Sequence, residues 1–421
     1  MSALQSATGR RRLTQSELEM ILGAHERFVT GKPGGKRASL RFVNFSGLDL
    51  SFRNLTDADL SASIFDSCRM VRTQLVRANL FGCDLRKADL RQSVLIRADL
   101  RGACLRGANL SQADLTQADF REGQIAIPHP SKGLDNLRHE ARMGEADGAN
   151  FSGAKLDGSQ FNGVSAFAAD FSDCSMRGAK LTGANLKDAN LAGAILDGAD
   201  VGGCNLEGAN MRGAVLTNCD TSIARVNGAD MAGALRAPDA AAMARAPSLI
   251  EMAKANQQWC TTGGREGAPA AFDGADLRML GDALKGFRLT AMNARGACLM
   301  GLDLSGAQLQ GANLQDADLR AVNLRGADLR GAKLNGANLT KADLRQAYLG
   351  PLPLSADRSN PSNLTGTALR YAMFQTSDLS EAILDNADMR GMDLTGAKLG
   401  KTSVRGCNLD QVIGADFAGQ N

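Results

Sequence analysis

Histidine and cysteine are the residue types in this sequence that can act as general bases, nucleophiles or ligands of transition metals. The chain has three histidines and nine cysteines. His129 and His139 share a segment, but nothing beside His129 supplies a metal-ligand pattern, and no two cysteines have the Cys-x-x-Cys spacing. The residues therefore predict neither a metal site nor a catalytic triad. We expect a protein that is not an enzyme and that has no cofactor.

Glycine and lysine gather in one segment, Gly31-Lys32-Pro33-Gly34-Gly35-Lys36, which suggests a phosphate-binding loop. Such a loop requires a glycine five residues before its Gly-Lys pair and a serine or threonine after it. Here Arg37 and Ala38 follow the last lysine. We therefore interpret the segment as a structural turn.

Arginines give a stronger indication of function, because several recur at steps of twenty residues. Arg86 and Arg106 form one such pair, and Arg101 and Arg121 form another. Like charges stacked on one surface cost free energy unless carboxylates or an acidic ligand lie between them. Two interpretations stay open: neutralisation by aspartates of the same surface, or binding of an acidic partner surface. The aspartates available for neutralisation are Asp99, Asp119, Asp328 and Asp343.

The elements that must position these arginines follow a strict period of five. Every fifth residue from Leu40 to Phe120 is apolar, and a small residue stands two positions before most of them, as Ala98 does before Leu100. Neither a helix nor a uniform strand has this period. The chain must therefore turn once in every five residues with the apolar pair facing inward. Arg53 occupies one of the small positions, so we expect the first coil to be irregular.

A single five-residue unit cannot fold alone. Burying one leucine and one alanine contributes roughly 2–3 kcal/mol, whereas ordering five residues costs roughly 1–2 kcal/mol for each backbone unit. Stacked coils must share a core and pair their backbones, so the sequence predicts a repeat solenoid.

The units have the form Ala-(Asp/Asn)-Leu-x-Gly and resemble the pentapeptide-repeat family. That resemblance implies a right-handed quadrilateral β-helix in which four pentapeptides make one twenty-residue coil. We therefore expect an all-β solenoid fold: two right-handed quadrilateral β-helices of pentapeptide repeats, each preceded by a short capping α-helix. The family carries many activities on one scaffold, so the resemblance predicts the fold more sharply than the function.

The register of the repeats divides the chain into two solenoids, each preceded by a helix and a glycine-rich turn. Thr14 to Glu17 and Ser248 to Glu251 both have the sequence of a capping box, which marks a helix start. The predicted boundaries are an N-terminal helix and glycine-rich cap at 1–37, a first solenoid at 38–235 with an insert loop at 123–148, a linker and second capping helix at 236–281, and a second solenoid at 282–421 with an insert loop at 351–361.

The composition and the charge pattern limit the cellular location of the protein and the class of its partner. The net charge is +3, and basic and acidic stretches alternate along the chain, which argues against a uniform DNA mimic and against a simple nucleic-acid binder. No apolar stretch approaches the roughly 20 residues of a membrane span. Arg10-Arg11-Arg12 is not followed by an apolar run, and the cysteine count is odd. We expect a cytoplasmic protein.

These observations predict a non-enzymatic scaffold that binds another protein through charged walls and projecting loops. We expect the partner at the first solenoid's arginines and at the insert, where a short amphipathic helix is predicted. The resemblance also implies an alternative, a DNA-mimic-like regulator or protector of DNA gyrase or topoisomerase. The predicted partner-binding residues are Arg86, Arg101, Arg106, Arg121, Leu134, Leu137 and Arg138.

Overall fold

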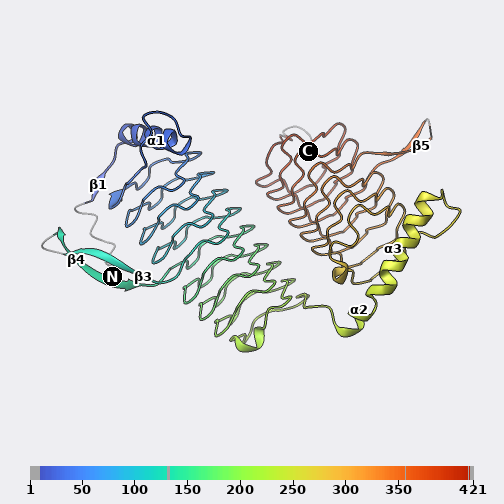
Figure 1. The fold of residues 1–421 in the computed structure, drawn as a ribbon, viewed down its shortest axis with the longest axis horizontal. Coiled ribbons are helices and arrows are strands. Elements are labelled where there is room, and N and C mark those ends of the chain that lie inside the picture. Colours follow the sequence, from blue (N-terminus) through green and yellow to red (C-terminus); the bar gives the residue numbers. More distant parts are fainter. Residues whose placement is uncertain (1–9, 130–132, 356, 416, 418–421) are drawn as a thin grey trace. The chain divides into compact units, whose positions relative to one another are not determined.

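The computed structural model describes residues 10–129, 133–355, 357–415 and 417 (Figure 1). The chain divides into two compact units, Met1–Ala237 and Pro238–Asn421. Each unit is a stack of coils. No helix in the described part of the chain is long and apolar enough to cross a membrane.

Backbone pairing between successive coils builds both units. In the first unit, Asp59, Ile64, Arg69 and Gln74 each form a parallel bridge with the residue twenty positions further on. Four consecutive bridges, five residues apart, complete one turn, so each coil has four sides. Most sides contribute a single bridged residue, and named strands are therefore few. The sequence prediction of a four-sided β-solenoid is confirmed at this level.

A left-handed backbone conformation supplies the turn in each five-residue unit. Gln92, Arg97 and Gly102 stand at successive turns with φ of 59°, 56° and 63°. Glycine adopts this region at little steric cost, whereas other L-residues adopt it rarely. The regular recurrence of this conformation explains why the period is five, and why glycine is so abundant at the fifth position.

The core is the row of apolar residues that the period predicted. Leu80, Leu100 and Leu329 are fully buried, as are the alanines two positions before most centres. In the first unit the row includes a cluster of rings: the Phe120 and Phe161 centroids lie 4.2 Å apart, and Phe151 and Phe171 stack at 4.8 Å.

Helix α1, Gln15–Val29, begins with the predicted capping box between Thr14 and Glu17. Its Leu18 and Leu22 belong to the same buried cluster as the first coils. The buried His25 ring accepts a hydrogen bond at Nδ1 from the backbone N–H of Ala38, 3.0 Å away, where the first coil begins.

Arg53 does not disturb the first coil. Its side chain leaves the small inward position and forms ion pairs with Glu19 and Glu26 of α1. The Nε–Oε1 distance to Glu26 is 2.8 Å. The neighbouring Asn54 still bridges Gln74, so the expectation of an irregular coil is wrong.

Helix α3, Ala246–Thr261, stands before the second stack of coils as α1 stands before the first. Its buried Asn256 accepts a backbone N–H at the start of the second stack, as His25 does at the start of the first. The amide oxygen of Asn256 accepts from the backbone N–H of Ala270 at 3.0 Å, and its Nδ2 donates to the carbonyl of Thr290 at 3.1 Å.

The second predicted capping box is wrong. Helix α2, Ala240–Ala244, runs almost directly into α3, so the backbone is already helical before Ser248. Arg245 occupies the N-cap position without a side-chain cap, and the Ser248 hydroxyl donates to the Arg245 carbonyl instead of capping a helix start.

The predicted helix in the insert is also wrong, because Leu134, Leu137 and Arg138 lie in a strand. Strand β3, Gly123–His129, pairs antiparallel with β4, Gly133–Arg142. The insert is therefore a hairpin whose backbone groups pair with each other. Regular coiling resumes at Glu145, before the predicted end of the insert at 148.

The remaining elements are short. Bridges of the second unit begin at Ala271, earlier than the predicted start at 282. The insert at 351–361 is a second antiparallel hairpin. The short elements are β1 (Arg11–Arg12), which pairs parallel with β2 (Val43–Asn44), η2 (Thr221–Ile223), η3 (Arg278–Leu280), β5 (Leu352–Ser355) and β6 (Arg358–Asn360).

The ring cluster gives a test of the core. Phe161 is fully buried between Phe120 and Phe171, so Phe161→Ala should destabilise the first unit by about 3–5 kcal/mol. Hydrogen-exchange mass spectrometry of peptides from 144–180 should show faster exchange. Phe167→Ala is the control, because Phe167 is 43% exposed and its loss should leave exchange unchanged. Equal effects of the two variants would contradict the assigned register.

The pH dependence of stability tests the role of the buried His25. Burial lowers the pKa of His25, so the folded state resists protonation more than the unfolded chain does. The stability contributed by neutral His25 is complete above the unfolded pKa of about 6.5 and falls as pH decreases below it. Asn256 shows that asparagine can hold the same backbone N–H, so His25→Asn should remain folded and lose this part of the pH dependence.

The measurement is the urea midpoint of the wild-type and His25→Asn proteins at pH 7.5 and pH 5.5. An identical decrease for both proteins would show that His25 is not the titrating group.

Candidate interaction surface

Two neighbouring sides of the first unit carry the arginines predicted from the sequence. Arg101 and Arg121 lie on one side, and Arg86 and Arg106 lie on the next. The first wall is the side with the bridged residues Asp59, Asn79, Asp99 and Asp119, and the second wall is the side with the bridged residues Ile64, Asp84, Cys104 and Glu145.

The hairpin β3–β4 projects from the corner between these two walls. The chain passes through Asp119 and Arg121 on the first wall, enters β3 at Gly123, and returns at Glu145 on the second wall. Cys104 and Glu145 are 41 positions apart rather than 20, so the insert adds 21 residues to one coil. The structure thus brings the predicted arginines and the predicted insert to one place.

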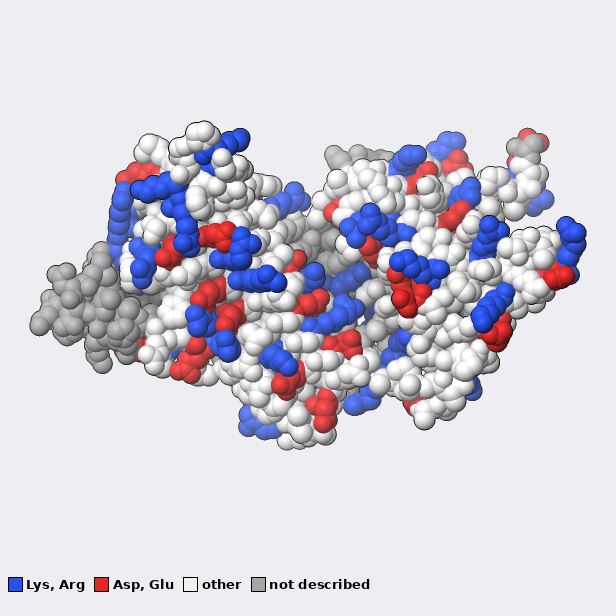
Figure 2. All heavy atoms as spheres, in the orientation of Figure 1, with Lys and Arg blue, Asp and Glu red and all other residues white. Residues whose placement is uncertain are grey.

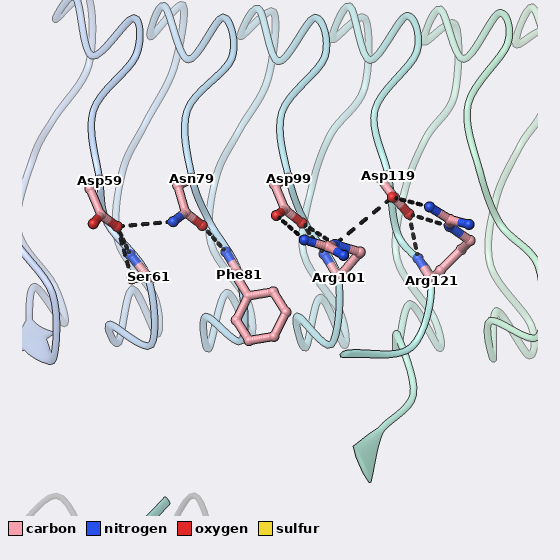
Figure 3. A network of polar contacts seen from close by, with 8 residues as sticks. All are labelled: Asp59, Ser61, Asn79, Phe81, Asp99, Arg101, Asp119 and Arg121. Carbon is pink, nitrogen blue, oxygen red and sulfur yellow. Dashed lines mark hydrogen bonds and ion pairs between the residues drawn. The ribbon is translucent and has the colours of Figure 1, made fainter. Parts of the chain in front are cut away.

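A ladder of polar side chains runs along the first wall (Figure 3). Asn79 donates from Nδ2 to Asp59 Oδ1 at 3.1 Å, and its own Oδ1 accepts from the backbone N–H of Phe81 at 3.1 Å. Asp99 accepts from the backbone N–H of Arg101 in the same way, at 3.2 Å. The side chain before each central leucine therefore holds the turn that follows it, which is the ordinary structural role of aspartate and asparagine here.

Three of the predicted arginines are neutralised locally. Arg101 donates from Nε and Nη2 to the two carboxylate oxygens of Asp99 at 2.9 and 2.8 Å. Arg121 with Asp119 and Arg86 with Asp84 have the same bidentate geometry. Hydrogen bonds to Asp99 raise the pKa of Arg101. In each pair the aspartate stands two residues before its arginine, with Leu85, Leu100 or Phe120 between them, so the pairing is a local property of the repeat.

Arg106 lacks this local partner because Cys104 stands two residues before it. Its Nε reaches Glu145 Oε2 at 3.1 Å, on the first coil after the hairpin, and Asp147 at 3.9 Å. Glu145 also accepts from the thiol of Cys104 at 3.2 Å. Arg106 therefore ties the second wall to the point where the hairpin ends.

The hairpin begins against the first wall. A Cβ on Gly123 would lie 2.6 Å from Cε2 of Phe81, so only glycine fits without displacing that ring. The guanidinium of Arg101 lies over the same ring, 5.5 Å from its centroid. Neither Phe81 nor Gly123 was predicted from the sequence to be a site residue. The signal available was an aromatic residue twenty positions before Arg101.

The interpretation that neighbouring aspartates neutralise the arginines therefore fits the geometry. Positive and negative side chains are interspersed over the described coils on the face drawn in Figure 2. The guanidinium groups remain accessible, since the side chains of Arg86, Arg101 and Arg106 are 38%, 42% and 53% exposed. Leu134, Leu137 and Arg138 lie on β4, but their side chains are outside the described residues.

Within the described ranges, no group of three or more His, Cys, Asp or Glu side chains could hold a metal ion. The cysteines are free, and burial raises the pKa of Cys68 and Cys83 to about 12, so these thiols stay protonated at neutral pH.

The ladder makes a prediction about Asp99. Asp99→Asn should change the free energy of unfolding by less than about 0.5 kcal/mol, because Asn79 shows that an amide oxygen can hold the same turn and exposed ion pairs contribute little. Asp99→Ala leaves the N–H of Arg101 without its acceptor and should cost about 0.5–1.5 kcal/mol. Urea denaturation followed by circular dichroism measures both. Equal losses would mean that the ion pair, not the turn, carries the contribution of Asp99.

Comparison with known proteins identifies the repeats. Overlapping matches to the sequence profile described as pentapeptide repeats cover 44–124, 147–220, 312–350 and 362–411, which is more than half of the chain. No curated protein of similar sequence was found.

Similar solved structures include three pentapeptide-repeat or related proteins. HetL, from the cyanobacterium Nostoc and described as involved in regulating heterocyst differentiation, is 18% identical, with 93% of this chain and 96% of that chain covered and a TM-score of 0.13. QnrB1, described as a plasmid-mediated fluoroquinolone resistance protein, is 21% identical over 49% of this chain and 83% of that chain, with a TM-score of 0.20. Rfr23, from the cyanobacterium Cyanothece, is 24% identical over 29% of this chain and 91% of that chain, with a TM-score of 0.17.

The assignment rests on the repeat matches and on the twenty-residue coils. The expected fold of such repeats, a right-handed β-helical solenoid, agrees with the parallel bridges of both units. This chain therefore belongs to the pentapeptide-repeat family.

Proposed function

We propose that this protein is a non-enzymatic scaffold that binds a protein partner at the corner formed by the first wall, the second wall and the hairpin β3–β4. The observation that carries the proposal is the position of that hairpin, which leaves the solenoid between the two arginine pairs. Loops and hairpins that leave a rigid scaffold commonly carry its function.

The solenoid supports binding through its rigidity. The backbone N–H of Leu100 donates to the backbone carbonyl of Asp119 on the next coil at 2.8 Å. Equivalent backbone hydrogen bonds recur along the stack. The bidentate aspartates fix the arginines of both walls as well. A partner therefore loses little free energy in ordering this surface, which favours affinity.

The charges favour a partner with both signs on its surface. The guanidinium of Arg101 uses Nε and Nη2 on Asp99, and its Nη1 has no hydrogen bond among the described residues, so Nη1 can donate to carboxylates or carbonyls of a partner. The aspartates beside the arginines accept from lysine or arginine. A surface on which arginines and aspartates alternate favours a partner surface with the complementary order of charges, and it disfavours a partner surface that carries one sign only.

The hairpin adds a second mode of contact. Among the described residues β3 and β4 pair only with each other, so each has an outer edge that an extended segment of a partner can join through backbone hydrogen bonds. Such pairing would place the partner beside Phe81 and Arg101 at the base of the hairpin.

The charges support a protein-binding scaffold better than they support a DNA mimic that protects DNA gyrase. The net charge is +3, and the aspartates of the first wall are paired with arginines instead of forming a continuous negative surface. The free cysteines accord with a reducing compartment, and we place the protein in the cytoplasm on that ground.

We further propose that the two units are two β-helices whose first coils are capped by α1 and α3. The contacts of His25 with Ala38 and of Asn256 with Ala270 support this, because each satisfies a backbone N–H at the start of a stack. An open coil end exposes unpaired backbone groups and invites edge-to-edge association.

The test of the corner uses two variants. In one, residues 123–143 are deleted, which removes the 21 inserted residues and restores the twenty-residue step. In the other, Arg86, Arg101 and Arg121 are each changed to glutamine. Partners captured from the native cell are identified by mass spectrometry, and the affinity of the purified partner is measured by calorimetry. Both variants should weaken binding at least tenfold, about 1.4 kcal/mol.

A matched control changes Arg91, Arg345 and Arg390 to glutamine. Each of these forms the same bidentate pair with the aspartate two residues before it, and their side chains are 41%, 42% and 41% exposed. The control should bind as the wild type does. A partner that binds both corner variants with wild-type affinity would contradict the proposed site.

A further inference from the structure

An open cavity of about 490 Å³ lies in the second unit between the carboxyl end of α3 and one wall of the coils. Trp259 lines it from the helix, Arg288, Gln308 and Arg330 line it from three successive coils, and Leu352 lines it from strand β5. A volume of this size is typical of sites for small organic molecules.

Part of the cavity lining is linked by hydrogen bonds. Thr290 donates from its hydroxyl to Gln310 Oε1 at 2.8 Å, and Gln310 donates from Nε2 to Asp328 Oδ2 at 2.7 Å. Asp328 also forms a bidentate pair with Arg330. These side chains are held in place, and the one carboxylate among them is fully engaged.

Arg288 stands apart from this network. It occupies the bridged position where the repeat usually has aspartate or asparagine, and Gly286 stands where other arginines find their aspartate two residues earlier. The side chain is exposed, and within the described residues it has no hydrogen bond or ion pair. The half-buried side chain of Gln308 also has no hydrogen bond among the described residues. The guanidinium N–H donors of Arg288 are therefore available to a molecule bound in the cavity.

Trp259 contributes a large, partly buried aromatic surface. The backbone of Gly264 lies against it, since a Cβ on Gly264 would be 3.3 Å from the indole Nε1. Leu352 adds an apolar side chain and is itself held against Gly331, where a Cβ would lie 2.7 Å from that of Leu352. The cavity thus combines an unpaired cation with aromatic and aliphatic surface.

We propose that this cavity binds a small organic anion that carries an aromatic ring, with Arg288 holding the carboxylate or phosphate and Trp259 packing on the ring. The guanidinium fork matches both anions in bidentate geometry. The indole favours stacked or edge contacts with a second ring. A cation would meet the charges of Arg288 and Arg330, and a neutral ring would leave Arg288 without a partner. This site is separate from the proposed protein-binding corner and does not depend on it.

The test uses the full chain and two probes that differ in their anion, AMP and 2-naphthoate, with adenosine, 2-naphthol and inorganic phosphate as their truncated counterparts. Calorimetry measures the affinities. Trp259 is the only tryptophan of the chain, so a change in intrinsic fluorescence with AMP reports on this cavity. We expect at least one of the two anions to bind with Kd below about 1 mM. Its neutral counterpart, and phosphate alone, should bind at least tenfold more weakly.

Arg288→Gln should weaken the binding of the anion about 10- to 100-fold, because it removes a charged hydrogen-bond donor. Arg405→Gln is the matched control: Arg405 is exposed, lies on another side of the same stack in its last coils, and also has no side-chain partner among the described residues. Trp259→Phe should reduce affinity less than Trp259→Ala.

The proposal is overturned if neither anion binds below about 1 mM, if adenosine or 2-naphthol binds as tightly as its anion, or if Arg288→Gln binds as the wild type does. Binding of inorganic phosphate as tight as that of AMP would overturn the role of the ring. If Arg288→Gln fails to fold, the comparison of AMP with adenosine on the wild-type protein decides the question.

Discussion

Hydrogen bonds between backbones twenty residues apart are the constraint on which the rest of this structure depends. Each side of a coil contributes one bridged residue, and a left-handed turn carries the chain to the next side, as Arg97 and Gly102 do. Leucine and alanine then face inward because they flank the bridged residue. The same geometry stacks every outward side chain above the one twenty positions away, so the surface consists of columns.

Columns explain why several arginines of this protein have a carboxylate close by in sequence. A stack of arginines alone would be unfavourable, and an aspartate two residues before the arginine neutralises the guanidinium within the same coil, as Asp99 and Asp119 do. Some arginines that lack this local aspartate are placed differently. Arg106 reaches across to Glu145 where the hairpin ends, Arg53 reaches α1, and Arg288 has no side-chain partner among the described residues.

The sequence predicted the features that the period controls and failed where tertiary contacts decide. The burial of Leu80 and Leu329 and the shared column of Arg101 and Arg121 follow from counting in fives and twenties. The spacing of Leu134, Leu137 and Arg138 suits a helix, but pairing with β3 satisfies their backbone as a strand. The second solenoid begins earlier than predicted because η3 disturbs the count: Asp276 bridges Cys298, 22 positions on. The cavity beside Trp259 was not predictable, since its lining comes from segments distant in sequence.

The hairpin lies at the corner between the two walls because the coil register continues across it. Asn109 and Asn150, which are bridged across the insert, can test this register directly when both are changed to cysteine. Neighbouring parallel strands lie about 4.8 Å apart, within the range that a disulfide spans. After mild oxidation, peptide mapping by mass spectrometry should find a disulfide between positions 109 and 150. It should find none when cysteine replaces Asn109 and Lys155, which lie on different sides. A disulfide in the second pair but not in the first would contradict the register.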